Sequence, residues 1–95
     1  MARAHIHDRA RVPPFVPGAP RTRYLVVCQD NAWHIKFDGE EYGPYVSERE
    51  AVLFAIEAAH MLCKQGEPTE VLVVDEHGDS RPEWTSGLDP YPPRH

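Results

Sequence analysis

The residues best suited to chemistry in this chain are two cysteines and the histidines that accompany them. His60 and Cys63 lie three positions apart in a segment of helical periodicity, so both would project from one face and could share a divalent metal. Two ligands are too few for a zinc site, and Cys28 would complete one only if its strand reached the end of that helix. The paired ligand spacings of zinc sites are absent. We therefore expect no metal site and two reduced cysteines that serve as small apolar side chains.

Catalysis by either cysteine would need a neighbouring base and a lowered thiol pKa. His34 or His60 could supply the base, but no glycine-rich turn or flanking motif accompanies Cys28 or Cys63. The six glycines are isolated from one another, so no loop is built to hold a phosphate. A core this small also leaves little room for a pocket of typical ligand size. The sequence therefore predicts no catalytic residue, no cofactor and no small-molecule ligand.

The composition is that of one globular domain. Of the 95 residues, 41% are hydrophobic and 26% are charged. No apolar run approaches the roughly 18 residues that cross a membrane. Pro13, Pro14 and Pro17 stand where a secretory signal would have a continuous apolar stretch. We therefore expect a cytoplasmic protein without a membrane segment.

Charge is divided unevenly along the chain. The first 23 residues contain five arginines and one aspartate, a balance of +4, and because the total is −5 the remaining residues carry −9. An acidic folded part disfavours nucleic-acid binding, since that binding depends on neutralising phosphates. A nucleic-acid-associated protein that uses the N-terminal arginines is the alternative.

Prolines and a glycine set the N-terminal residues apart from the rest: Pro13, Pro14, Pro17, Gly18 and Pro20. Prolines remove backbone donors and prevent a continuous helix or central strand. We therefore expect residues 1–22 to form a disordered arm rich in proline and arginine. Residues 23–93 would then form the single domain, including a C-terminal strap.

Two segments rich in strand formers follow the arm. Tyr24 to Gln29 and Trp33 to Asp38 are separated by Asp30-Asn31, which supplies turn chemistry, so the sequence predicts a β-hairpin. A two-residue loop would place Cys28 beside Trp33, whereas a three-residue loop would place Val27 there. Both registers direct the same alternate side chains of the second strand to the core: Trp33, Ile35 and Phe37.

A helix is predicted from Glu48 to Gln65. Ser47 and Glu50 have the spacing of a capping box at its start, and Gly66 suits the left-handed conformation that ends a helix. The apolar stripe expected to meet the sheet consists of Ala51, Phe54, Ala55, Ala58 and Leu62. Four further apolar residues widen the arc and predict a second contact surface, for the strap or for another subunit: Val52, Leu53, Ile56 and Met61.

A continuous apolar run from Thr69 to Asp75 predicts a buried third strand. The helix makes a crossover between the second and third strands, and a right-handed crossover places the third strand parallel to the first. The expected fold is therefore an α+β, ββαβ domain. Its three-stranded sheet has the order 2-1-3, with one helix packed on one face.

The strap, residues 81–93, carries a large aromatic anchor among turn-forming residues. Burial of the Trp84 indole is worth a few kcal/mol, so we expect it to dock on its own domain, with a partner as the alternative. Tyr91-Pro92-Pro93 could adopt polyproline II and enter a groove. The candidate interaction surface comprises Trp84, Asp89, Pro90, Tyr91, Leu53 and Ile56.

The segment from Tyr24 to Pro93 resembles the small bacterial proteins grouped as domain of unknown function 2188. The resemblance rests on Trp33-His34-Ile35-Lys36 after a polar turn, on Glu50-Ala51, on His77-Gly78, and on the ending Trp84-Thr85-Ser86-Gly87-Leu88-Asp89-Pro90-Tyr91-Pro92-Pro93. It covers about three quarters of the chain and excludes the first 22 residues. The resemblance implies a type of fold and contributes no catalytic residues.

These observations favour a non-enzymatic interaction or accessory module. A domain of about 60 residues buries only about 60% of its unfolded surface and is marginal alone. We therefore expect a docked C-terminal strap, a homodimer or both, with a protein partner as the other form of complex. The nucleic-acid-associated protein is the second reading, and a small enzyme or metal-binding protein is the third.

Overall fold

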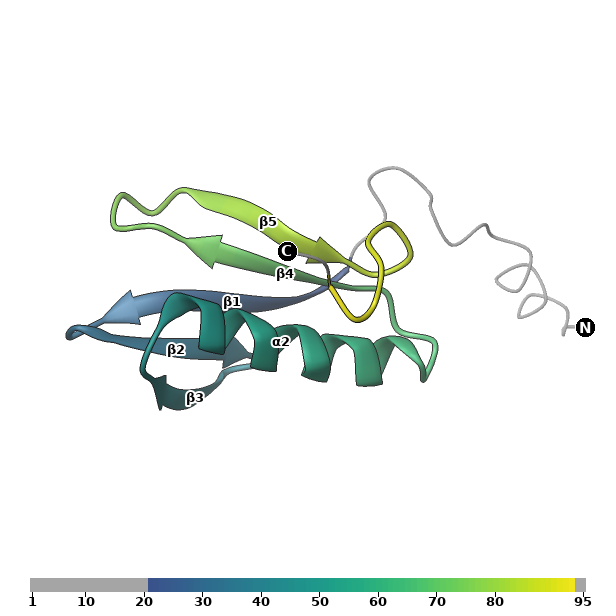
Figure 1. The fold of residues 1–95 in the computed structure, drawn as a ribbon, viewed down its shortest axis with the longest axis horizontal. Coiled ribbons are helices and arrows are strands. Elements are labelled where there is room, and N and C mark those ends of the chain that lie inside the picture. The colour runs from purple at the N-terminus through teal and green to yellow at the C-terminus, as the bar shows by residue number, and fades with distance from the viewer. Residues whose placement is uncertain (1–20, 94–95) are drawn as a thin grey trace, which may run out of the picture.

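The computed structural model describes residues 21–93, which form one mixed sheet with a single helix across one face (Figure 1). The strands are β1 (Thr22–Gln29), β2 (Ala32–Phe37), β3 (Glu40–Tyr45), β4 (Thr69–Val74) and β5 (Ser80–Thr85), and helix α2 (Glu48–Cys63) connects β3 to β4. The strand order is β3-β2-β1-β4-β5. β1 and β4 are parallel, and the other neighbours are antiparallel. Residues 1–20 of the predicted disordered arm lie outside the described residues.

The predicted three-stranded sheet of order 2-1-3 is wrong, because the sheet has five strands. The missed strands are the two edges, β3 and β5, and each contains a proline, Pro44 or Pro82. Proline is tolerated at an edge because the outward side of an edge strand needs no backbone donor. The same residues lower the strand propensity of both segments, so their sequences resemble turns. Residues 80–85 form a strand in the structure, although the sequence predicted most of them as the start of the strap.

The β1–β2 hairpin has the two-residue register. Asp30 and Asn31 form the turn with φ values of 53° and 64°, which match the twist of the flanking strands. Cys28 consequently pairs with Trp33, and the ring of Tyr24 stacks on Phe37 with centroids 4.2 Å apart. The prediction that alternate β2 residues face the core is confirmed, since Ile35 is buried and its neighbours pack against the core cluster: Trp33 and Phe37.

Helix α2 begins as predicted and ends earlier. The Glu50 amide donates to Ser47 Oγ at 3.1 Å, but the Glu50 carboxylate accepts from the Val46 amide, not from that of Ser47. Both bonds satisfy donors at the helix start that have no partner within the helix. The last helical residue is Cys63, two before the predicted end at Gln65.

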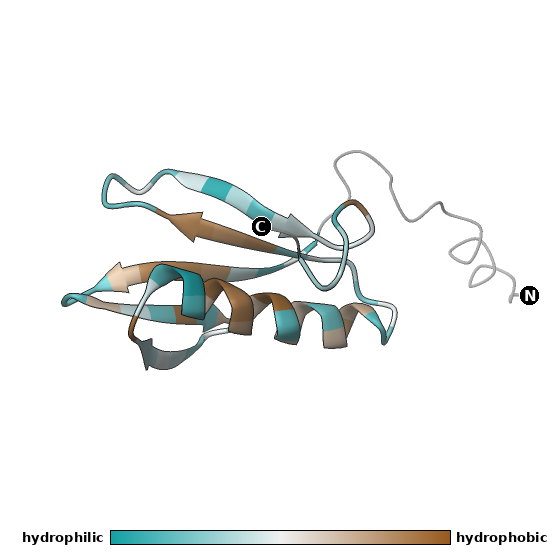
Figure 2. Ribbon diagram, viewed as in Figure 1, coloured by the Kyte–Doolittle hydropathy of each residue, from teal (hydrophilic) through white to brown (hydrophobic). Residues whose placement is uncertain are grey.

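The face that α2 buries differs from the predicted stripe. Ala51, Ala55 and Ala59 are fully buried, and small side chains let the helix approach the sheet closely. The other buried positions are Val52 and Ile56, whereas Phe54 and Ala58 from the predicted stripe are exposed. The helix packs mainly against β4 and β1, so its inward face is rotated from the expected stripe. Figure 2 shows the hydrophobic residues concentrated in these strands and in the helix.

Trp84 anchors the strap within its own chain, as predicted. Its side chain is 2% exposed and belongs to the core, and its Nε1 donates to the Pro90 carbonyl at 2.9 Å. A bulge in the β4–β5 pairing places Trp84 opposite Val71 on the helix side of the sheet. Two residues after Trp84, Ser86 Oγ accepts a hydrogen bond from the Thr69 amide at 3.0 Å. The strap thus closes one end of the core.

We predict that Trp84→Ala lowers the free energy of unfolding by about 3 to 5 kcal/mol, because it removes a buried indole from a small core. Urea denaturation followed by circular dichroism measures this change. Leu88→Ala is the matched control in the same strap, because Leu88 is 67% exposed, and it should change stability by less than about 0.5 kcal/mol. Equal effects of the two substitutions would show that Trp84 does not anchor the fold.

Candidate binding groove

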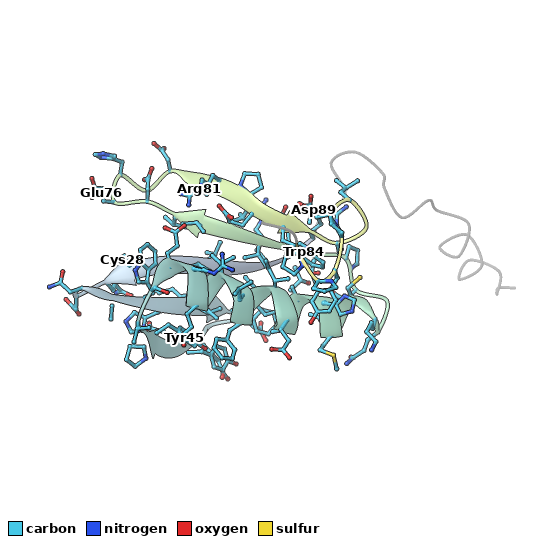
Figure 3. All side chains as sticks on the ribbon, viewed as in Figure 1. Cys28, Tyr45, Glu76, Arg81, Trp84 and Asp89 are labelled. Carbon is cyan, nitrogen blue, oxygen red and sulfur yellow. The ribbon has the colours of Figure 1, made fainter. Side chains whose placement is uncertain are left out.

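One helix cannot cover the whole face of this sheet. A helix is about 10 Å wide, whereas five strands spaced about 4.8 Å apart extend over about 19 Å. Because α2 lies mainly over β4 and β1, a strip of sheet remains on each side of it. On the β5 side this strip is filled by Trp84 and the strap. Figure 3 labels Trp84 on that side and Tyr45 on the opposite, β3 side.

The strip on the β3 side forms an open aromatic groove of about 450 Å³. Its lining residues are Tyr24, Ile35, Phe37, Tyr42, Tyr45, Phe54, Glu57, Ala58 and Met61. Three large apolar side chains at this groove remain substantially exposed: Tyr42 at 43%, Phe54 at 49% and Met61 at 52%. Exposed apolar side chains that gather into a patch are a mark of interaction sites, whereas singly scattered ones are normal. We call this feature the aromatic groove.

Two stacked ring pairs build the aromatic groove. Tyr24 and Phe37, on neighbouring strands, lie almost parallel at 2°. Tyr45 and Phe54 have centroids 5.3 Å apart and connect β3 to the helix. Tyr24 is buried, but the other three rings leave apolar surface that is available at little cost in side-chain entropy.

A bulge in β3 directs two tyrosines into the aromatic groove. Tyr45 pairs with Trp33 and Tyr42 pairs with Ile35, so both tyrosines share the helix side of the sheet although they are three residues apart. Gly43, between them, has φ of 127°, and a Cβ there would lie 3.0 Å from the Trp33 carbonyl oxygen. Only glycine fits this backbone without strain.

Two carboxylates lie beside the neutral rings of the aromatic groove. Glu57 lines it, and the Tyr42 hydroxyl donates to Glu40 at 3.3 Å. Partial desolvation and then the charge of Glu40 raise the pKa of Tyr42, while burial and then the neighbouring Tyr42 raise the pKa of Tyr24. Both phenols are therefore neutral at physiological pH. The groove suits an apolar segment that carries positive charge, because cations are attracted to ring faces and to carboxylates.

The predicted interaction residues of the strap lie together, away from the aromatic groove. Trp84 is buried, Pro90 accepts its indole hydrogen bond, and Asp89 Oδ2 accepts from the Thr85 amide at 2.8 Å. Tyr91 stacks on His60 with centroids 3.7 Å apart, and both rings meet Trp84 edge-on. These residues therefore fold the strap onto its own helix.

The two predicted helix residues also lie outside the aromatic groove. Leu53 and Ile56 line a separate hollow beside Glu83 and Pro93. Ile56 is 3% exposed and belongs to the core, whereas Leu53 is partly exposed. Ile56 therefore packs in the core, whereas Leu53 lies at the surface.

The sequence pattern does not reveal Tyr42 and Tyr45 of the aromatic groove, because it predicts a turn where the structure has β3. The signal that could have found them is Asp38-Gly39, a strong hairpin dipeptide, here with φ values of 52° and 80°. A strand after that turn would have placed Tyr42 and Tyr45 beside β2. Phe54 was assigned to the buried stripe, although it lies at the edge of the helix contact.

Neither cysteine lines the aromatic groove. Cys28 is exposed, and Cys63 is partly buried at the C-terminal end of the helix. Among residues 21–93, no group of three or more His, Cys, Asp or Glu side chains is arranged to hold a metal ion. In the same range, the helix is too short and too polar to cross a membrane. Comparison with protein-family models, curated proteins and solved structures found no match to this chain. The resemblance to domain of unknown function 2188 therefore stays a prediction.

We predict that the groove residue Phe54 is largely dispensable for folding. Phe54→Ala should lower the free energy of unfolding by less than about 1 kcal/mol, because about half of this side chain is already in water. Ile56→Ala, two residues along the same helix, should cost about 2 to 5 kcal/mol because Ile56 is in the core. Urea denaturation measures both, and a larger loss for Phe54→Ala would assign Phe54 to the core.

Proposed function

We propose that this protein is a non-enzymatic interaction module that binds an extended apolar segment of a protein in the aromatic groove. The observation that carries the proposal is the gathering of exposed Tyr42, Phe54 and Met61 around a floor of stacked rings. Grooves walled by aromatic side chains are a recurring means of binding extended peptides. The rings provide apolar contact, and Glu57 favours a segment with a basic residue.

The shape of the aromatic groove favours a peptide over a small metabolite. It lies beside the helix and next to the edge strand β3 and is open to solvent, so an extended chain has access to it. Met61 adds a flexible thioether, a side chain that adapts to different apolar partners. Small-molecule sites, by contrast, enclose most of the ligand surface.

The experiment that tests this proposal is selection of peptides from a displayed random library on the full chain. We expect selected peptides to contain apolar residues with proline or a basic residue, and Phe54→Asp to weaken their binding at least tenfold by placing a charge on the groove wall. Leu88→Asp is the control, because Leu88 is exposed on the strap. Peptides that bind both variants equally, measured by isothermal titration calorimetry, would contradict the proposal.

Self-association through the other face of the sheet is a second proposal. Four apolar side chains lie together on the face opposite the helix, in two neighbouring pairs of the parallel ladder: Leu25 with Leu72 and Val27 with Val74. They are only partly buried, and within residues 21–93 no helix covers them. The salt bridge between Arg23 and Glu70 lies beside them at 2.8 Å. This apolar centre with a charged border is typical of a homodimer face.

We expect sedimentation equilibrium to show a dimer that Leu72→Lys converts to a monomer, because a charge at the centre of an apolar interface is left unpaired. Val46→Lys is the control, since Val46 is 90% exposed and lies before the helix. A monomer at every concentration, or a dimer unaffected by Leu72→Lys, would contradict this second proposal.

A further inference from the structure

We propose that the aromatic groove is occupied by a segment of its own chain, Arg11 to Pro17. This inference rests on the proposed function of the groove and names its occupant. The segment reads Arg-Val-Pro-Pro-Phe-Val-Pro, with Pro14 three residues after Arg11 and Pro17 three residues after Pro14. Polyproline II has three residues per turn, so these three side chains fall on one edge of the helix it would form. Aromatic grooves bind that edge in proline-rich ligands.

The chemistry of the segment complements that of the groove. Pyrrolidine rings and the Phe15 ring can pack on the exposed rings of Tyr42 and Phe54 and on the partly buried Phe37, whose other face stacks on Tyr24 with centroids 4.2 Å apart. A basic residue at one end of the segment, Arg11, matches the carboxylate of Glu57 on the groove wall. The whole chain has the same complementarity, with +4 on its first 23 residues and −9 on the remainder.

The segment is also long enough to reach the groove from its point of attachment. Three residues separate Pro17 from Arg21, so the two positions are four steps apart and can be about 13 Å from each other. β1 starts at Thr22, and β3 lies two strands away, a distance of about 10 Å. Tyr24 of the groove floor is only two residues into β1. Docking within one chain therefore needs no partner.

Covalent attachment gives the segment an advantage over free ligands. A short linker holds a ligand at an effective concentration in the millimolar range, so even a weak docking interaction keeps the groove filled. A partner segment must then compete with Arg11 to Pro17 for the same rings. The N-terminal segment is thus an internal competitor for the groove.

The test uses the full chain, labelled with nitrogen-15, and an unlabelled synthetic peptide with the sequence of residues 9–17. In the double variant Pro14→Ala/Pro17→Ala, the attached segment loses the two prolines on the binding edge. We expect the peptide to bind this variant at least tenfold more tightly than it binds the unmodified chain, with shifts at the amides of Tyr42, Phe54 and Glu57. Arg3→Glu, a charge reversal outside the segment, should bind the peptide as weakly as the unmodified chain.

Two results would overturn the inference: no binding of the peptide to either protein, or equal binding to both. If library peptides still bind the groove in that case, the proposed function survives and only the occupant is wrong. If no peptide of any sequence binds there, both proposals fail. A difference between the two proteins that vanishes on tenfold dilution would assign the segment to a second copy and overturn docking within one chain.

Discussion

A single helix is narrower than the five-stranded sheet on which it packs, and this mismatch shapes the rest of the structure. Helix α2 lies mainly over β1, the middle strand, and its neighbour β4, which are largely apolar on both faces. Its inward face is built on Ala51, Ala55 and Ala59, whose small side chains let it lie close to the sheet. Both margins of the helix-bearing face therefore need additional cover, and the chain meets that need differently on the two sides.

On the β5 side the cover comes from the strap. Trp84 fills the space, and the Pro90 carbonyl accepts its indole hydrogen bond. The Ser86 hydroxyl oxygen accepts a hydrogen bond from the amide of the buried Thr69. On the β3 side, the lining consists of rings from β1, β2, β3 and α2, and the groove between them is open. The asymmetry explains why buried aromatic residues on one side serve stability, whereas exposed ones on the other are available for binding. A small domain gains stability from any segment that fills such a groove.

The sequence was sufficient to predict the central elements and insufficient for the edges. Regular alternation identified β2, the apolar run identified β4, and Ser47 with Glu50 marked the helix start. β3 and β5 were missed because Gly43, Pro44 and Pro82 weaken strand propensity, which matters little at an edge. The buried face of the helix was misplaced because its apolar arc is wide, and only the contact with the sheet selects a part of it. The aromatic groove depends both on strand β3 and on which face of the helix is buried. Neither feature alone is enough to predict it.

Peptide binding in the aromatic groove is tested most directly by an isotope-filtered nuclear Overhauser measurement. The protein is labelled with carbon-13 and binds an unlabelled peptide selected from the random library. This experiment detects only contacts between the two molecules. If the peptide binds in the aromatic groove, its protons contact the rings of Tyr42 and Phe54 and the methyl group of Met61. Contacts confined to Leu25 and Leu72 on the other face of the sheet, or to the strap, would contradict it.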